Sequence, residues 1–380
     1  MPWKEVTYVE QRKFFMDLVL LPGANISEIC RRANVSRKTA YKWMNRYEVG
    51  VLSTLENQSR RPHLSPHQTI PAIERRILEH RENFPTWGAR KIQHLLKREA
   101  LPIVPAISTI TEILRRHGKL GMTKSTSAYQ RFERAAPNDL WQIDFKGHFA
   151  MGTNRCHPLT LLDDHSRYAL CLKACKDETG DTVKSALIQC FRHYGLPLQM
   201  NSDNGNPWGN SNPEETWNRF AIWLMKLGIQ LTHSRPYHPQ TNGKLERFHR
   251  SLKQELLNQR NFGDLGEAQQ AFDEWKHLYN HYRPHEAINM RTPSERYQPS
   301  FRPYSELPPR VEYADGTIRK VDAAGRISFK GHALRIGKSF EGEYVAIKET
   351  DQEEIYSIFF MQMMVGTVDL SLPNPSWIRV

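Results

Sequence analysis

The chain has 380 residues and a net charge of +12, and 39% of its residues are apolar. A chain of this length and apolar content can form several packed domains, which excludes an intrinsically disordered protein. The sequence has no apolar run of the roughly 20 residues that a membrane-spanning helix needs. Its five cysteines form no C-x-x-C pair. We therefore expect a cytoplasmic protein without membrane segments or a disulfide framework.

The positive charge is confined to the first third of the chain. Residues 1–137 contain 24 Lys and Arg against 12 Asp and Glu, whereas residues 138–380 contain 29 of each. Neutralisation of phosphates by basic side chains is the main source of non-specific affinity for nucleic acid. The distribution favours a nucleic-acid-binding front end joined to a neutral catalytic part, and a merely soluble basic domain is the alternative.

Residues 25–47 show the pattern of two short helices separated by a turn at residues 33–35. Ser36 is suited to cap the second helix, and Ala40, Trp43 and Met44 give that helix an apolar face. The pattern predicts a helix-turn-helix unit whose second helix enters the major groove of DNA. The residues expected to contact DNA are Ser36, Arg37, Lys38, Tyr41 and Lys42.

A second helical unit is predicted between residues 73 and 118. The pattern of residues 108–116 predicts a capped recognition helix, in which Ile110, Ile113 and Leu114 face the core. The residues left for DNA contact are Thr109, Thr111 and Arg115. For both units, the alternative is an ordinary helical hairpin with solvated charges.

From Leu140 onward the pattern changes to strands. Strands are predicted at residues 140–145, 158–162, 168–172 and 199–202, with a helix at 181–194, which indicates a mixed sheet covered by helices. Asp144 lies in the first strand and Asp203 directly follows the last, so adjacent parallel strands would bring the two side chains together. A buried charged Asp is costly unless it is paired or metal-bound. An acid at the edge of a strand is the alternative for Asp144.

Glu246 falls on a predicted helix over residues 244–259. It shares one stripe of that helix with Arg250 and Lys253, which places a possible metal ligand beside cations that can bind phosphate. The alternative is a surface ion pair between Glu246 and Arg250, worth only a few tenths of a kcal/mol.

Each of these acids lies in a distinctive string: I-D-F at 143–145, S-D-N-G at 202–205 and H-P-Q-T-N-G-K-L-E-R at 238–247. In this order the strings resemble the three blocks of the integrase core shared by retroviral integrases and bacterial insertion-sequence transposases. The match covers residues 138–300, and with the helix-turn-helix units the layout is similar to bacterial insertion-sequence transposases with a DDE core. The 42 residues between Asp203 and Glu246 exceed the usual integrase spacing, and the surplus fits a loop at 206–213. No His and Cys spacing matches the zinc domain of retroviral integrases, which disfavours a retroviral assignment.

The resemblance implies a ribonuclease-H-like fold with Asp144, Asp203 and Glu246 as catalytic triad and as ligands of two Mg²⁺ ions, for which Mn²⁺ can substitute. The implied reaction is metal-dependent cleavage at the ends of a mobile DNA element, followed by transfer of the 3′-OH strand into target DNA. The implied partners are double-stranded DNA, as terminal inverted repeats and as target, and further copies of the chain in a homodimer or larger assembly. The expected location is the bacterial cytoplasm, at the nucleoid. A DNA-binding regulator and a nuclease without joining activity are the alternatives.

Further DNA contacts are expected in the second linker, in the loop before Glu246 and along its helix. They are Lys124, Arg235, His238, Gln240, Asn242, Lys244, Arg247, His249, Arg250 and Lys253. We expect His238 and His249 to contact DNA rather than to act as bases. Asp163 and Asp164 are the main rivals for a catalytic role, but Asp and Ser residues at such a position more often shape a turn between strands.

After residue 310, short alternating strands separated by turn signals predict a small β-barrel. We therefore expect a multidomain chain with all-α helix-turn-helix units, a central α/β ribonuclease-H-like core and a C-terminal small β-barrel. The expected boundaries are a first helix-turn-helix domain at 1–56, a linker at 57–68, a second such domain at 69–118, a basic linker at 119–137, the catalytic core at 138–300 and the barrel at 301–380.

Overall fold

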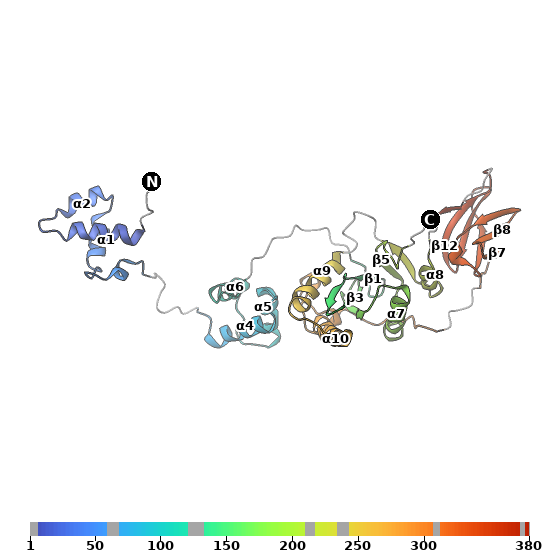
Figure 1. Cartoon of the computed structure of the whole chain (residues 1–380), viewed down its shortest axis with the longest axis horizontal. Helices are drawn as coiled ribbons and strands as arrows, with labels where there is room; N and C mark the ends of the chain where they lie inside the picture. Colours follow the sequence, from blue (N-terminus) through green and yellow to red (C-terminus); the bar gives the residue numbers. More distant parts are fainter. Residues whose placement is uncertain are drawn as a thin grey trace. The chain divides into compact units, whose positions relative to one another are not determined.

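The computed structural model describes residues 7–58, 68–120, 133–209, 217–233, 243–306, 312–372 and 377–379 (Figure 1). The chain divides into two compact units, residues 1–68 and residues 69–380. Among the described helices, none combines the length and the apolar character that a membrane crossing requires.

The first unit is a small helical domain. Its elements are α1 (Tyr8–Val19), α2 (Ile26–Arg32), α3 (Arg37–Met44) and the 3₁₀ helix η1 (Leu52–Leu55). Met16, Cys30, Ala40 and Trp43 are buried together in its core. The two helices and the turn predicted within residues 25–47 are confirmed, and Ser36 accepts a hydrogen bond from the backbone of Thr39 as the expected cap.

The second unit begins with another group of three helices, α4 (Pro71–Asn83), α5 (Ala89–Arg98) and α6 (Ile107–Arg116). Ile110, Ile113 and Leu114 of α6 face the shared core, as predicted. The expected side-chain cap is wrong, because the N-cap position of α6 is occupied by Ala106, which has no side-chain acceptor.

A mixed sheet forms the centre of the second unit, as predicted. Its strands are β1 (Leu140–Phe145), β2 (Phe149–Met151), β3 (Asn154–Asp163), β4 (Ala169–Cys175), β5 (Gln199–Ser202) and β6 (Gln230–His233). Strand β3 pairs antiparallel with β1, β2 and β4, while β5 runs parallel to both β1 and β6. The carboxyl ends of β1 and β5 therefore meet at the same edge of the sheet.

Helices cover both faces of this sheet (Figure 1). They are α7 (Gly180–Tyr194), α8 (Arg219–Lys226), α9 (Gly243–Leu252) and α10 (Leu265–His281). Ile143 of β1 packs in one buried cluster with Leu187 of α7, whereas Phe248 of α9 and Phe272 of α10 pack in a second cluster with Leu172 of β4. Helix α9 continues directly into a π-helix, η2 (Lys253–Leu257). Short 3₁₀ helices follow at η3 (Glu286–Ile288) and η4 (Pro293–Glu295).

The C-terminal part is all β, as predicted, but the described strands do not close into the expected barrel. One sheet has the order β13 (Trp377–Arg379), β12 (Met363–Asp369), β11 (Ile355–Phe360), β10 (Tyr344–Glu349) and β7 (Thr317–Lys320). Strands β8 (Arg326–Phe329) and β9 (His332–Arg335) form a separate hairpin, followed by the 3₁₀ helix η5 (Lys338–Phe340). Leu334 of the hairpin and Ile358 of the sheet are buried in one cluster, together with Ile222 of α8. Packing the hairpin and α8 against the sheet buries its apolar face, so closure of the sheet on itself is not needed.

Candidate active site and DNA-binding surfaces

Asp144 lies on β1, and Asp203 directly follows the neighbouring parallel strand β5. Leu140 of β1 is paired with Gln199 of β5, and Gln142 is paired with Asn201. If this register is continued by two residues, Asp144 is level with Asp203, which directly follows β5. The predicted parallel pairing of the strand that contains Asp144 with the strand that ends before Asp203 is confirmed.

The carboxyl group of Asp144 is strongly perturbed. Burial raises its pKa to about 7, and the negative charges of Asp203, Glu178 and Glu246 act in the same direction. A carboxyl that is buried among other carboxyls is stabilised by a cation, because the cation removes the repulsion that otherwise favours the protonated form. The three predicted acids therefore share one electrostatic environment.

Glu178 was not predicted from the sequence. It lies in the loop between β4 and α7, where its Oε1 is 2.8 Å from Nδ1 of His157. Its charge contributes to the raised pKa of Asp144. The string around Glu178 contains no motif, so the sequence offers no signal for this contribution.

Asp203 is held by the turn that follows β5. Its Oδ1 accepts a hydrogen bond from the backbone of Gly205 at 3.0 Å. A Cβ atom at position 205 would lie 3.3 Å from both carboxylate oxygens of Asp203. The glycine of the S-D-N-G string thus leaves room for the carboxylate beside the turn, whereas its backbone N–H orients the same carboxylate.

Glu246 lies in the first turn of α9 and is exposed. The helix is fixed by Leu245, Phe248 and Leu252, which are buried against the sheet and α10. Glu246 therefore faces away from the apolar contact and is available to a ligand.

The described ranges contain no group of three or more His, Cys, Asp and Glu side chains close enough to hold a metal ion together. The predicted triad is thus near enough for its charges to interact, but its oxygens do not form a common coordination shell in this conformation. The donor set nevertheless fits a hard divalent cation, because it consists of carboxylates and one of them has a raised pKa.

Asp163 shapes the turn after β3, as predicted, whereas the side chain of Asp164 in the same turn bonds segments that are distant in the sequence. Asp163 Oδ1 accepts hydrogen bonds from the backbone and hydroxyl of Ser166, and its Oδ2 accepts one from the backbone of Asn138. Asp164 Oδ2 accepts a hydrogen bond from the backbone of Arg134 at 2.8 Å. Both side chains are fully buried.

Some of the predicted DNA contacts on α9 and η2 are exposed, and others are buried. Arg247, Arg250 and Lys253 are exposed. The side chain of Lys244 is only 13% exposed and forms an ion pair with Asp164, so its ammonium group is already engaged. The prediction for His249 is wrong in this conformation, because its ring is buried against the sheet and bonded to Thr160. The sequence did contain a signal for this burial, because His249 lies four residues after Leu245 and three before Leu252, a spacing that places the three residues on one face of the helix.

The other predicted contacts near the core fall outside the described residues. They are Lys124, Arg235, His238, Gln240 and Asn242.

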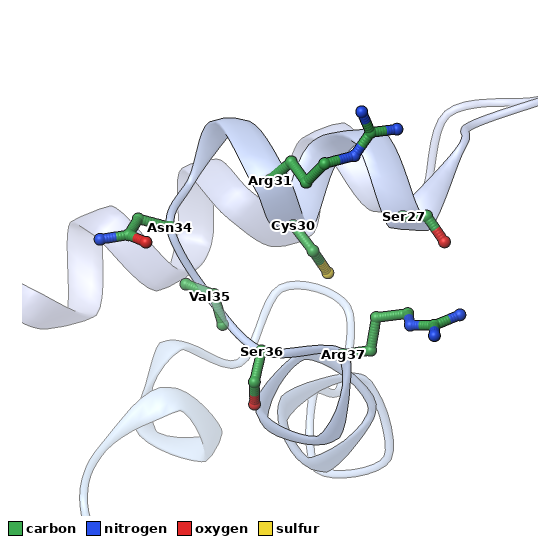
Figure 2. Close-up of a pocket in the computed structure, with 7 residues that line it drawn as sticks. All are labelled: Ser27, Cys30, Arg31, Asn34, Val35, Ser36 and Arg37. Atoms are coloured by element: carbon green, nitrogen blue, oxygen red, sulfur yellow. The ribbon is translucent and has the colours of Figure 1, made fainter.

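The first helix-turn-helix unit has an open hollow of about 620 Å³ at the turn between α2 and α3 (Figure 2). Residues from both helices and from the turn line it: Ser27, Cys30, Arg31, Asn34, Val35, Ser36 and Arg37. Arg37 and Lys38, as well as Tyr41 and Lys42 further along α3, are exposed as expected for a helix that contacts DNA.

In the second helical unit, Thr109 and Arg115 are exposed on α6. Arg115 forms an ion pair with Glu112, one turn away on the same helix. Thr111 is partly buried, and its hydroxyl donates to the carbonyl of Ile107 at 2.8 Å. Thr109 and Arg115 are therefore accessible, whereas the proton of the Thr111 hydroxyl is used within the helix.

Family models match most parts of the chain. Two models described as "Integrase core domain" match residues 134–239 and 227–293. A model described as "IS481 family transposase, C-terminal domain" matches residues 316–375. At the front end, a "Helix-turn-helix domain" matches residues 11–63 and a "Homeodomain-like domain" matches residues 39–114.

The chain is also similar to proteins encoded by bacterial insertion elements. It is 24% identical to an uncharacterized 39.2 kDa protein of insertion element IS476 from Xanthomonas euvesicatoria, over 74% of this chain and 80% of that protein. It is 22% identical to a putative transposase for insertion sequence element IS5376 from Geobacillus stearothermophilus, over 91% of this chain and 84% of the relative. The identity is 31% with an IS407 protein from Burkholderia multivorans, over 42% of this chain and 55% of that protein.

Among solved structures, the chain is similar to the HTLV-2 integrase catalytic core domain in complex with magnesium, at 21% identity and a TM-score of 0.33. This similarity covers 43% of this chain and 99% of the HTLV-2 chain. A simian T-cell lymphotropic virus intasome chain is 17% identical with a TM-score of 0.38, over 80% of this chain and 96% of the intasome chain.

Proposed function

Because this chain is an insertion-sequence transposase with an integrase core domain, we propose that Asp144, Asp203 and Glu246 are its catalytic triad. The observation that carries this proposal is the parallel pairing of β1 with β5, whose register brings Asp144 level with Asp203. In addition, burial and the charges of Asp203 and Glu246 raise the pKa of Asp144. Perturbed carboxyls of this kind are typical of functional sites.

We propose that the three carboxylates hold two Mg²⁺ ions, and that Mn²⁺ can replace them because it also prefers oxygen ligands. When bound, such a pair of ions activates the attacking hydroxyl and stabilises the leaving 3′ oxygen of a phosphodiester. Asp144 contributes a buried oxygen donor on the rigid sheet, Asp203 a donor held by the turn after β5, and Glu246 a donor on α9. The binding of two ions by three carboxylates requires α9 and the sheet edge to bring their oxygens closer together.

Residues outside the triad are proposed to bind and orient DNA. Arg247, Arg250 and Lys253 are exposed along the helix that carries Glu246, and we propose that they contact phosphates of the strand being cut. The two helix-turn-helix units are proposed to recognise the terminal inverted repeats of the element, with α3 and α6 as the recognition helices. We also propose that the protein acts at the bacterial nucleoid as a homodimer or larger assembly, because two element ends must be joined to one target.

The proposal is tested by strand transfer of end-containing DNA into a supercoiled target in the presence of Mg²⁺. The variants Asp144→Asn, Asp203→Asn and Glu246→Gln should each abolish cleavage and joining, while gel shifts with end DNA remain close to those of the unmodified protein. Any variant that joins at a near-normal rate removes its residue from the triad. Binding without cleavage by the unmodified protein indicates a regulator, and cleavage without joined product indicates a nuclease.

A further inference from the structure

A single buried carboxylate links the strand that carries Asp144 to the helix that carries Glu246. Asp164 directly follows β3 and is fully buried. Its Oδ1 accepts a hydrogen bond from Nε2 of Gln142 at 2.9 Å and forms an ion pair with Nζ of Lys244. The backbone carbonyl of Asp164 lies 3.3 Å from the same Nζ atom.

Both partners of Asp164 lie close in the sequence to proposed metal ligands. Gln142 precedes Asp144 by two residues on β1, and Lys244 precedes Glu246 by two residues at the start of α9. Side chains two residues apart on a strand point to the same face, so Gln142 and Asp144 lie on one face of β1. Asp164 therefore joins the neighbours of two proposed metal ligands through one oxygen atom.

The link is strong because it is buried. Gln142 is fully buried and the side chain of Lys244 is only 13% exposed, so solvent screens the ion pair little. The second carboxylate oxygen accepts a hydrogen bond from the backbone of Arg134, which fixes the carboxylate plane. Removal of either charge takes away a buried counter-charge of the other, a far larger perturbation than the loss of a surface pair.

We propose that Asp164 is a positioning residue of the transposition reaction, which limits the separation between Asp144 and Glu246 through Gln142 and Lys244 and so leaves only a small closure to metal binding. This inference rests on the proposed function, because it takes both acids to be metal ligands. It assigns Lys244 to the interior of the protein rather than to DNA. Groups that orient metal ligands from outside the coordination shell commonly change metal affinity about 10–100-fold when they are removed.

The first experiment measures joining at saturating DNA over a range of Mg²⁺ concentrations, with Asp164→Asn, Lys244→Met and the double variant. We expect each single variant to raise the Mg²⁺ concentration for half-maximal joining about ten-fold or more. Binding of end DNA without metal should change less than about two-fold, since no phosphate contact is lost. Lys244→Arg, which keeps the charge, should recover part of the loss. A matched control is Asp273→Asn, because Asp273 is 57% exposed and pairs with Lys276 on α10.

A second measurement separates this inference from the proposed function. Mn²⁺ alone is titrated in a thermal unfolding assay of the full chain, which needs no activity. A weaker Mn²⁺-induced shift in Asp164→Asn, at an unchanged fold by circular dichroism, supports the positioning role even if the unmodified protein joins no DNA. An unchanged metal requirement in both assays, or a loss of DNA binding in Lys244→Met with normal metal dependence, overturns it.

Discussion

The ring of His249 on α9 lies 2.8 Å from the hydroxyl oxygen of Thr160 on β3. The same hydroxyl donates its single proton to the carbonyl of Asp144, at 2.8 Å. Nε2 of His249 must therefore carry a proton and donate it to the hydroxyl. Burial lowers the pKa of His249, which keeps the ring neutral. This chain of bonds is a second link between the strand of Asp144 and the helix of Glu246, formed by a residue that follows Glu246 in the sequence, whereas Lys244 precedes it.

The first prediction concerns Thr160→Val, which keeps the shape of the side chain and removes its hydroxyl. The N–H of His249 would then be buried without an acceptor, so we expect a loss of about 1–3 kcal/mol in the free energy of unfolding. Denaturant unfolding of the full chain measures this change. Thr160→Ser keeps the hydroxyl and should lose clearly less. Equal stability of Thr160→Val and the unmodified protein would show that the bond contributes nothing.

The second prediction concerns the stability of the protein in mild acid. Burial, together with the charge of Lys146, lowers the pKa of His249 to about 4, whereas an unfolded histidine titrates near about 6.5. Between these values the unfolded state binds a proton that the folded state does not, so stability is lost as the pH falls from 6.5 towards 4. The full effect is roughly 3 kcal/mol.

The carboxyl group of Asp144 changes the stability of the protein in the opposite direction over nearly the same pH range. Its folded pKa is about 7, so in the absence of metal the folded state holds a proton that the unfolded state has released. Its contribution therefore favours the fold at low pH and is lost as the pH rises towards 7. The effect of His249 is best measured as the difference between the unmodified protein and His249→Gln in chelator-treated buffer. That difference should shrink as the pH falls, and a constant difference between pH 7 and 4 would rule out a buried neutral histidine.

The sequence predicted the elements that depend on local pattern. Strands β1 and β5 have the predicted bounds because apolar runs in an α/β core are short and clearly bounded. The strand pairing that brings Asp144 to Asp203 followed from these two elements. The triad residues themselves were indicated by their strings, and their roles stay a prediction.

Other features depend on contacts between distant residues and were not predictable in this way. The helix expected to reach residue 259 changes to a π-helix at Lys253, where Glu255 is bonded to Arg283. Strand β12 was not predicted, and it contains Gly366, which interrupts a strand pattern. The role of Asp164 depends on partners 22 and 80 residues away in the sequence.

The third prediction concerns the ion pair between Glu255 and Arg283. Their side chains are only 8% and 12% exposed, and Nη2 of Arg283 lies 3.0 Å from Oε1 of Glu255. Glu255 also accepts hydrogen bonds from Trp275 and from Thr86. Glu255→Gln leaves the guanidinium buried without its counter-charge, so we expect a loss of about 3 kcal/mol in the free energy of unfolding.

The control for this prediction is the exposed pair between Arg192 and Glu306, whose side chains are 59% and 61% exposed. Glu306→Gln makes the same chemical change on the surface and should cost no more than about 1 kcal/mol. Denaturant unfolding of both variants gives the comparison. Similar losses in the two variants would mean that burial does not strengthen the inner pair.

The last prediction concerns the exposed cations of α3 in the first unit. Arg37 and Lys38 lie at the start of this helix, beside the hollow that Ser36 and Arg31 also line. If both contact phosphates, Arg37→Ala and Lys38→Ala should each weaken binding of end DNA and of unrelated DNA. Each should also reduce the slope of log affinity against log salt concentration by roughly 0.9. Lys13→Ala removes one exposed charge from α1 of the same unit and serves as the matched control. Equal slopes for Lys13→Ala and Arg37→Ala would mean that α3 binds DNA only through the net charge of the domain.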